Sequence, residues 1–167
     1  MRVVLGVSSV WSKSKGLLDF IELSKRDDLL VVLVGVSERV RKTLPPEIIA
    51  ISRTQNQQEL AMLYSLADVF VNPTYADMFP TVNLEAMACG TPVMTYKTGG
   101  SPEAVTTETG CVVEQGALND LVVAIEDFCK RDRVRLAKVC RERAEQEFDK
   151  DQCFEKYIEL YEELINK

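Results

Sequence analysis

Histidine is absent from this chain of 167 residues. The absence excludes Ser-His and Cys-His nucleophilic catalysis, metal binding by imidazole and histidine acid/base chemistry. Any catalysis must therefore use carboxylates, lysines, hydroxyl groups or the substrate itself.

The common cysteine and glycine motifs are also absent. The five cysteines form an odd set without a Cys-x-x-Cys pair, which argues against a disulfide framework and against a zinc site. Neither G-x-G-x-x-G nor G-x-x-x-x-G-K-[ST] follows the first apolar run, so the usual dinucleotide and P-loop fingerprints are missing.

Long apolar runs are also missing. No segment approaches the ~18 apolar residues of a membrane span, and residues 1–11 lack the apolar core of a signal peptide, so we expect a cytoplasmic protein. The net charge of −6 argues against nucleic-acid binding, which needs clustered Lys and Arg. A small anionic ligand needs only one or two local cations and some N–H groups, so it remains compatible with this charge.

Short apolar runs alternate with helical patterns over the first two thirds of the chain. Several runs are continuous instead of alternating, which is typical of parallel strands covered on both faces. The expected strands span 2–9, 29–36, 47–52, 68–73, 92–96 and 111–113. The pattern predicts an α/β fold with a doubly wound parallel sheet, in which ligands bind beyond the carboxyl ends of the strands.

After Gly116 the pattern becomes helical, and apolar stripes continue to Ile165. We expect a single domain over 1–167, with a helical C-terminal extension from about 117. The terminal stripe in "FEKYIELYEELI" suits either ordinary core packing or an interface with another domain.

Lys13 and Lys15 immediately precede Gly16 and the first expected helix. A lysine at this place can reach a phosphate held at a helix N-terminus, where free N–H groups already favour anions. The alternative is an exposed lysine beside a turn glycine.

The stretch "DMFPTVNLEAMACGTPV" carries two acids, Asp77 and Glu85, on either side of Pro80. Proline suits the first turn of a helix, which places the helix start near residues 79–82. Glu85 then lies about one turn inside the helix, where a carboxylate can accept hydrogen bonds from sugar hydroxyls. The alternative is that Asp77 caps the loop and Glu85 is a solvated helix residue.

The next loop, "KTGGSPEAV", contains Gly99 and Gly100, which permit close approach of a ligand. We expect Ser101 to cap a short helix whose first position is Pro102. An ordinary turn is the alternative.

These segments together resemble the C-terminal, donor-binding domain of the retaining family-4 (group 1) glycosyltransferases of the GT-B fold, of the bacterial polysaccharide-biosynthesis type. The similarity lies in the Asp77-x7-Glu85 pair, in "LEAMACGTPV", in "GGSPE" and in the "KG" after the first strand, and it covers nearly the whole chain. The resemblance implies a Rossmann-like domain, one half of a GT-B fold.

The resemblance also implies roles for individual residues. Lys15, aided by Lys13, would meet the diphosphate of a UDP- or GDP-sugar, and the backbone around Phe79, Pro80, Thr81 and Val82 would cradle the same phosphates. Glu85 would bind the ribose and Asp77 the transferred sugar. Main-chain atoms of Arg53 and Thr54 would touch the base, and Gly99–Gly100 would close the pocket. Asp77, Glu85 and Lys15 would be the catalytic residues.

The implied reaction moves a hexose to an acceptor hydroxyl with retention and without a metal. In this family the acceptor, a glycan or a lipid-linked molecule, binds an N-terminal domain that is absent here, so we expect the fragment alone to be inactive. The full enzyme would associate peripherally with a membrane. Two positions differ from the family pattern: its leading acid is usually Glu instead of Asp77, and Val10 stands where many members carry Arg.

Two other classes of protein share this type of fold. A stand-alone nucleotide-binding or regulatory module without transferase activity is the main alternative, although a receiver domain would need an acidic cluster after the first strand, where this chain has "SSVWSKSKG". An epimerase acting on nucleotide sugars would be expected to use histidine.

Overall fold

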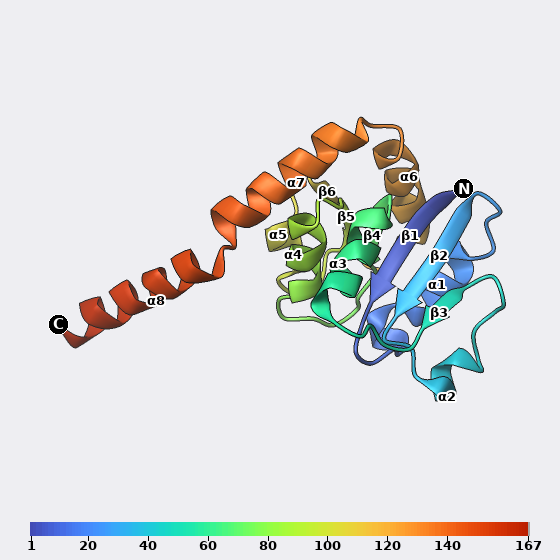
Figure 1. Cartoon of the computed structure of the whole chain (residues 1–167), viewed down its shortest axis with the longest axis horizontal. Coiled ribbons are helices and arrows are strands. Elements are labelled where there is room, and N and C mark those ends of the chain that lie inside the picture. Colours follow the sequence, from blue (N-terminus) through green and yellow to red (C-terminus); the bar gives the residue numbers. More distant parts are fainter. Residues whose placement is uncertain (167) are drawn as a thin grey trace.

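The computed structural model describes residues 1–166 and contains one six-stranded parallel sheet in the order β3-β2-β1-β4-β5-β6 (Figure 1). The strands are β1 (Arg2–Val7), β2 (Leu29–Val34), β3 (Ile49–Ile51), β4 (Val69–Asn72), β5 (Val93–Tyr96) and β6 (Gly110–Val113). Every pair of neighbouring strands is parallel, so the predicted doubly wound sheet is confirmed.

Eight α-helices and one short 3-10 helix connect and cover the strands within residues 1–166. They are η1 (Lys13–Lys15), α1 (Leu17–Leu23), α2 (Glu38–Arg41), α3 (Gln57–Leu66), α4 (Thr81–Ala88), α5 (Ser101–Ala104), α6 (Leu118–Phe128), α7 (Arg133–Glu147) and α8 (Lys150–Ile165).

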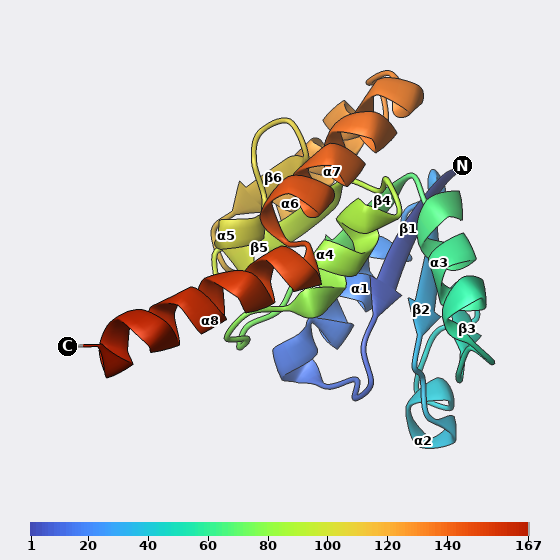
Figure 2. The same cartoon turned by 60° about the vertical axis from the view of Figure 1, so that its left-hand side comes forward.

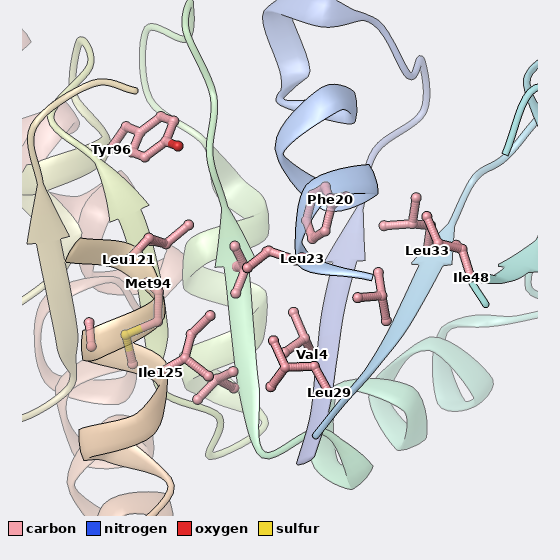
Figure 3. Packing of buried hydrophobic residues seen from close by; sticks show 14 of the residues in the cluster. Val4, Phe20, Leu23, Leu29, Leu33, Ile48, Met94, Tyr96, Leu121 and Ile125 are labelled. Atoms are coloured by element: carbon pink, nitrogen blue, oxygen red, sulfur yellow. The ribbon is translucent and has the colours of Figure 1, made fainter. Parts of the chain in front are cut away.

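Helices pack on both faces of the sheet because the strands are apolar on both sides. Helices α1 and α6 bury Phe20, Leu23 and Ile125 against one face, in one cluster with Val4 and Met94 of the strands; Figure 3 shows Ile125 beside Met94. On the other face, α3, α4, α5 and α7 contribute a second buried cluster. Burial of side chains of this size stabilises the fold by about 1.5–3 kcal/mol each.

The helical C-terminal part divides into two kinds of helix. Helices α6 and α7 belong to the two layers that cover the sheet, whereas α8 buries no residue and projects away from the body (Figures 1 and 2). Phe154, Tyr157 and Tyr161 on α8 are each about 60% exposed, at 62%, 59% and 61%. Core packing is therefore the wrong explanation for the terminal apolar stripe.

The strand order reverses between β1 and β4, because the chain adds strands outward on the β2 side first and then on the β5 side. In doubly wound sheets this switch point is where the two flanking loops part and leave room for a ligand. The loops after β1 and β4 are the ones that carry Lys15 and Asp77.

Candidate functional site

A cavity of about 210 Å³ opens at the carboxyl ends of β1 and β4. Two chain segments form its walls, one following each strand. The lining residues are Val7, Ser8, Ser9, Trp11, Lys15, Phe20, Val71, Asn72, Asp77, Phe79, Pro80, Thr81 and Val82. The cavity therefore lies at the switch point and brings together six of the residues predicted from sequence.

Hydrogen bonds fasten the two walls to each other. The Tyr75 backbone N–H donates to the Ser14 carbonyl at 2.8 Å, and the Thr74 hydroxyl donates to the same oxygen at 3.2 Å. Gly16 lies against Pro73 at φ 71°, where an added Cβ would come within 2.4 Å of the Pro73 carbonyl oxygen. This close contact requires glycine at the position after Lys15. It also fixes the backbone from which the Lys15 side chain extends.

Lys15 and Asp77 form an ion pair across the mouth of the cavity. The Lys15 ammonium lies 2.6 Å from Asp77 Oδ2, and it also contacts the Ala76 carbonyl at 3.4 Å. Both side chains are partly exposed, so a ligand can reach them. The positive and negative groups predicted for this site are thus direct neighbours.

The N-terminus of α4 supplies hydrogen-bond donors at the same cavity. The N-cap residue is Pro80, which has no side-chain acceptor, and no partner for the N–H groups of Thr81 and Val82 is found among residues 1–166. Free N–H groups and the helix dipole attract anions at such a helix start.

A chain of buried side chains holds this helix start in place. Asn72 Nδ2 donates to Asn83 Oδ1 at 2.9 Å, and Asn83 Nδ2 donates to Ser101 Oγ at 3.0 Å. Ser101 Oγ in turn lies 2.6 Å from Thr95 Oγ1. The prediction that Ser101 caps α5 is therefore wrong: Gly100 is the cap residue, and the buried Ser101 hydroxyl links β5 to α4.

The glycine pair packs directly on the loop that carries Asp77. The Gly100 N–H donates to the Met78 carbonyl at 2.7 Å. Gly99 adopts φ 50°, and an added Cβ there would overlap the Asp77 carbonyl oxygen. The two glycines thus contact the site through its backbone, although they do not line the cavity.

Glu85 lies apart from the cavity, on the exposed side of α4. Its Oε2 accepts a hydrogen bond from the Tyr64 hydroxyl at 2.9 Å. It lines a neighbouring groove between α4 and the α7–α8 junction, together with Arg141 and Lys150. Burial, and then the charge of Glu85, raises the pKa of Tyr64 far above its usual range, which keeps the hydroxyl protonated.

Three other predicted residues also lie outside the cavity lining. Lys13 is exposed in η1, and Arg53 and Thr54 follow β3, which is separated from β4 by β2 and β1. Ser8, Ser9, Trp11 and Asn72 line the cavity but were not singled out from sequence; their place at or after the ends of β1 and β4 was the available signal.

A second hydrogen-bond network, which the sequence analysis missed, supports the loop of residues 73–80 that carries Asp77 (the Asp77 loop). Asp19 of α1 is 7% exposed and accepts hydrogen bonds from Tyr96 at 2.7 Å and from Tyr75 at 3.2 Å. Burial and these contacts raise the pKa of both tyrosines. Gln115 donates to the Tyr75 carbonyl at 2.9 Å and completes the support.

The fold and the cavity define a Rossmann-like α/β domain with an open, cation-bearing site at its switch point. Residues 2–147 match the family described as glycosyl transferases group 1, and the chain belongs to that family.

Curated relatives agree with this assignment. The D-inositol 3-phosphate glycosyltransferase of Mycobacteroides abscessus is 34% identical over 116 residues, which is 69% of this chain and 24% of the relative. The protein of the same description from Saccharomonospora viridis is 34% identical over 139 residues, or 81% of this chain and 30% of the relative. The chain thus spans less than a third of these relatives.

Solved structures share the fold. Sucrose-phosphate synthase from Thermosynechococcus elongatus superposes with a TM-score of 0.85 at 28% identity, over 99% of this chain and 46% of that chain. Anabaena HepE, solved in complex with UDP-glucose, gives 0.77 at 22% identity, over 97% and 49%. The Rossmann-like half of a GT-B glycosyltransferase is therefore confirmed as the fold class.

No helix within residues 1–166 is long and apolar enough to cross a membrane. The same residues contain no group of three or more acidic or cysteine side chains arranged to hold a metal ion.

Proposed function

We propose that this chain is the nucleotide-sugar-binding domain of a retaining glycosyltransferase. The observation that carries the proposal is the meeting of Lys15, Asp77 and the free N–H groups of α4 at one cavity on the switch point. A diphosphate needs such cations and donors, and a sugar attached to it needs a hydrogen-bonding group next to them.

In this proposal the diphosphate lies between Lys15 and the start of α4. Charge grows on the leaving diphosphate as the anomeric bond breaks, and fixed donors that already point at that charge lower the barrier. Lys15 and the N–H groups of Thr81 and Val82 perform this task, and because they supply the compensating charge the reaction is metal-independent.

The remaining groups orient the donor. Asp77 accepts hydrogen bonds from hydroxyls of the transferred hexose, and Glu85 accepts them from the ribose. Main-chain atoms near Arg53 and Thr54 contact the base, while Lys13 adds positive charge near the phosphates and the Gly99–Gly100 loop holds the Asp77 loop in place. A UDP-sugar is the preferred donor to test, since the HepE structure of the same fold was solved with UDP-glucose.

The whole transferase requires a second domain for the acceptor. The chain spans 46% and 49% of the two solved chains above, which is consistent with one domain of two. We propose that a cytoplasmic, peripherally membrane-associated enzyme of bacterial polysaccharide or glycoconjugate synthesis uses this domain, and that the domain alone binds the donor without turnover.

Calorimetric titration with UDP, GDP and ADP tests the proposal. We expect saturable binding of one nucleotide, and Lys15→Ala should weaken it by about tenfold, the loss of one charge-assisted contact. Lys156→Ala on the exposed α8 is the matched control. The corresponding nucleoside without phosphates should bind both proteins equally. Equal weakening of the nucleoside, or no binding of any nucleotide, would contradict the proposed site.

A further inference from the structure

Tyr64 and Glu85 lie on adjacent helices, and one hydrogen bond joins their side chains. Tyr64 belongs to α3 and Glu85 to α4, two helices that cover the same face of the sheet. The tyrosine hydroxyl donates to Oε2 of the carboxylate over 2.9 Å. The bond thus connects a core residue to an exposed acid.

Tyr64 is held through both its ring and its backbone. Its side chain is 1% exposed, and its ring meets the Phe70 ring edge-on at 5.4 Å. Its backbone carbonyl accepts a hydrogen bond of 2.6 Å from the Thr91 hydroxyl. The hydroxyl is therefore held in place relative to the sheet, because close packing confines a buried ring and the Thr91 hydrogen bond anchors the backbone.

The glutamate has the opposite character. It lies on the solvent side of α4, and a free glutamate side chain loses about 1.5–2 kcal/mol of rotamer entropy when it is ordered. A ligand that had to order this side chain would bind more weakly by part of that amount. The bond from Tyr64 orders the carboxylate before any ligand arrives.

We propose that Tyr64 is a positioning residue that presents the Glu85 carboxylate to the ribose hydroxyls of the donor. This inference rests on the proposed function, in which Glu85 binds the ribose. Tyr64 holds Oε2, while Oε1 and the remaining lone pair of Oε2 accept the hydrogen bonds of the vicinal diol. The core residue acts only through Glu85 and does not touch the ligand.

A structural role alone would give a different pattern. If the bond only satisfied a buried hydroxyl, its loss would lower stability and affect all nucleotides alike. If it orients Glu85 for the diol, its loss must affect only ligands that carry the diol. A nucleoside diphosphate and its 2′,3′-dideoxy analogue separate the two cases.

The test titrates the 167-residue chain and Tyr64→Phe with the nucleoside diphosphate that binds the unmodified chain and with its 2′,3′-dideoxy analogue. We expect Tyr64→Phe to weaken the ribonucleotide about three- to tenfold, the range of one net hydrogen bond, and the dideoxy analogue by less than about twofold. Tyr157→Phe on α8, which is exposed, is the control and should change neither value.

Equal weakening of both ligands, or of neither, overturns the inference. Glu85→Asp provides a second variant that leaves the core untouched: its shorter side chain cannot hold Tyr64 and reach the diol together, so it should show the same selective loss. If the unmodified chain binds both ligands equally well, the ribose assignment of Glu85 in the proposed function fails instead, and that result is visible before any variant is measured.

Discussion

The Lys15 ammonium and the Asp77 carboxylate lie 2.6 Å apart although 62 positions separate them in the chain. The pair spans the two loops that diverge at the switch point, and the Tyr75–Ser14 hydrogen bond beside it keeps those loops together. The charge of Lys15 is thus compensated by Asp77, and a diphosphate that binds here must share Lys15 with Asp77.

Asp77→Asn should strengthen binding of the nucleoside diphosphate by up to about fivefold, because a partly exposed ion pair of this kind is worth about 0.2–1 kcal/mol and the variant releases Lys15 from it. The nucleotide sugar should gain nothing, since it loses its contact with the carboxylate. Calorimetry with both ligands measures the ratio. Binding of the nucleoside diphosphate that weakens as much as is predicted for Lys15→Ala would instead show that Asp77 holds the lysine in its binding position.

Gly99→Ala should displace the Asp77 loop. The residue has φ 50°, which costs a residue with a Cβ about 1–2 kcal/mol, and the added atom also overlaps the Asp77 carbonyl oxygen. Gly116→Ala is the matched control, because it has φ 81° but its nearest contact would be an ordinary 3.7 Å to the Tyr75 hydroxyl.

Both alanine variants should therefore lose stability in urea unfolding, and Gly99→Ala alone should also lose nucleotide-sugar binding. The idea that Gly99 sets the loop position would be refuted by a Gly99→Ala protein that binds the nucleotide sugar as tightly as Gly116→Ala.

Tyr96→Phe should destabilise the fold more than Tyr75→Phe does, although both hydroxyls donate to Asp19. Tyr96 is fully buried at 0% exposure and its bond is 2.7 Å, whereas Tyr75 is 38% exposed and its bond is 3.2 Å. A buried hydrogen bond to a charged group contributes about 1.5–3 kcal/mol, so Tyr96→Phe should approach this range. Denaturant midpoints compare the stability of the two variants. Equal losses of stability would mean that the two hydrogen bonds to Asp19 contribute equally, despite their different burial.

The chain should lose stability in alkali as the pH rises from about 9 towards 12, because burial raises the pKa of the Cys140 thiol from 9.0 to about 12. In this range the unfolded thiol has released its proton while the folded thiol retains it, so the folded state binds more protons and its free energy of unfolding falls with pH.

Urea unfolding at several pH values above 8 measures this slope. Cys140→Ala should flatten it, whereas Cys153→Ala on α8 should not; buried tyrosines contribute equally to all three proteins. An identical slope in Cys140→Ala would assign the alkaline loss to other groups.

Removal of residues 150–167 should change the free energy of unfolding by less than about 0.5 kcal/mol, because α8 buries no residue and surface changes have effects of this size. A helix of 16 residues without packing is marginal in water, so its amides should exchange quickly with solvent. Hydrogen exchange on the full chain and urea unfolding of the shortened one check both points. A large loss of stability would show that α8 packs on the body in solution.

The alternation of apolar runs and helical stripes was sufficient to predict the sheet and its class. Strands such as Leu29–Val34 are continuous and apolar because both of their faces are covered, and that property is local to the sequence. The loops that bear Lys15 and Asp77 could also be predicted, since they follow strands of a parallel sheet and must emerge at the same edge.

Contacts between residues distant in the chain could not be read in this way. No local pattern indicates that Asp19 meets Tyr96, or that Ser101 turns inward to Asn83 and leaves the cap to Gly100. The amphipathic stripe of α8 also looks the same whether it packs on its own domain or projects from it.

Backbone propensity and the period of apolar residues act over a few neighbouring positions, so the order of amino acids alone specifies which elements form and which edge of the sheet carries the polar loops. The pairs of side chains that meet, Lys15 with Asp77 and Tyr64 with Glu85, are established only in the packed fold. Those pairings depend on the order of strands and on how helices settle onto the sheet, and both are properties of the packed chain as a whole.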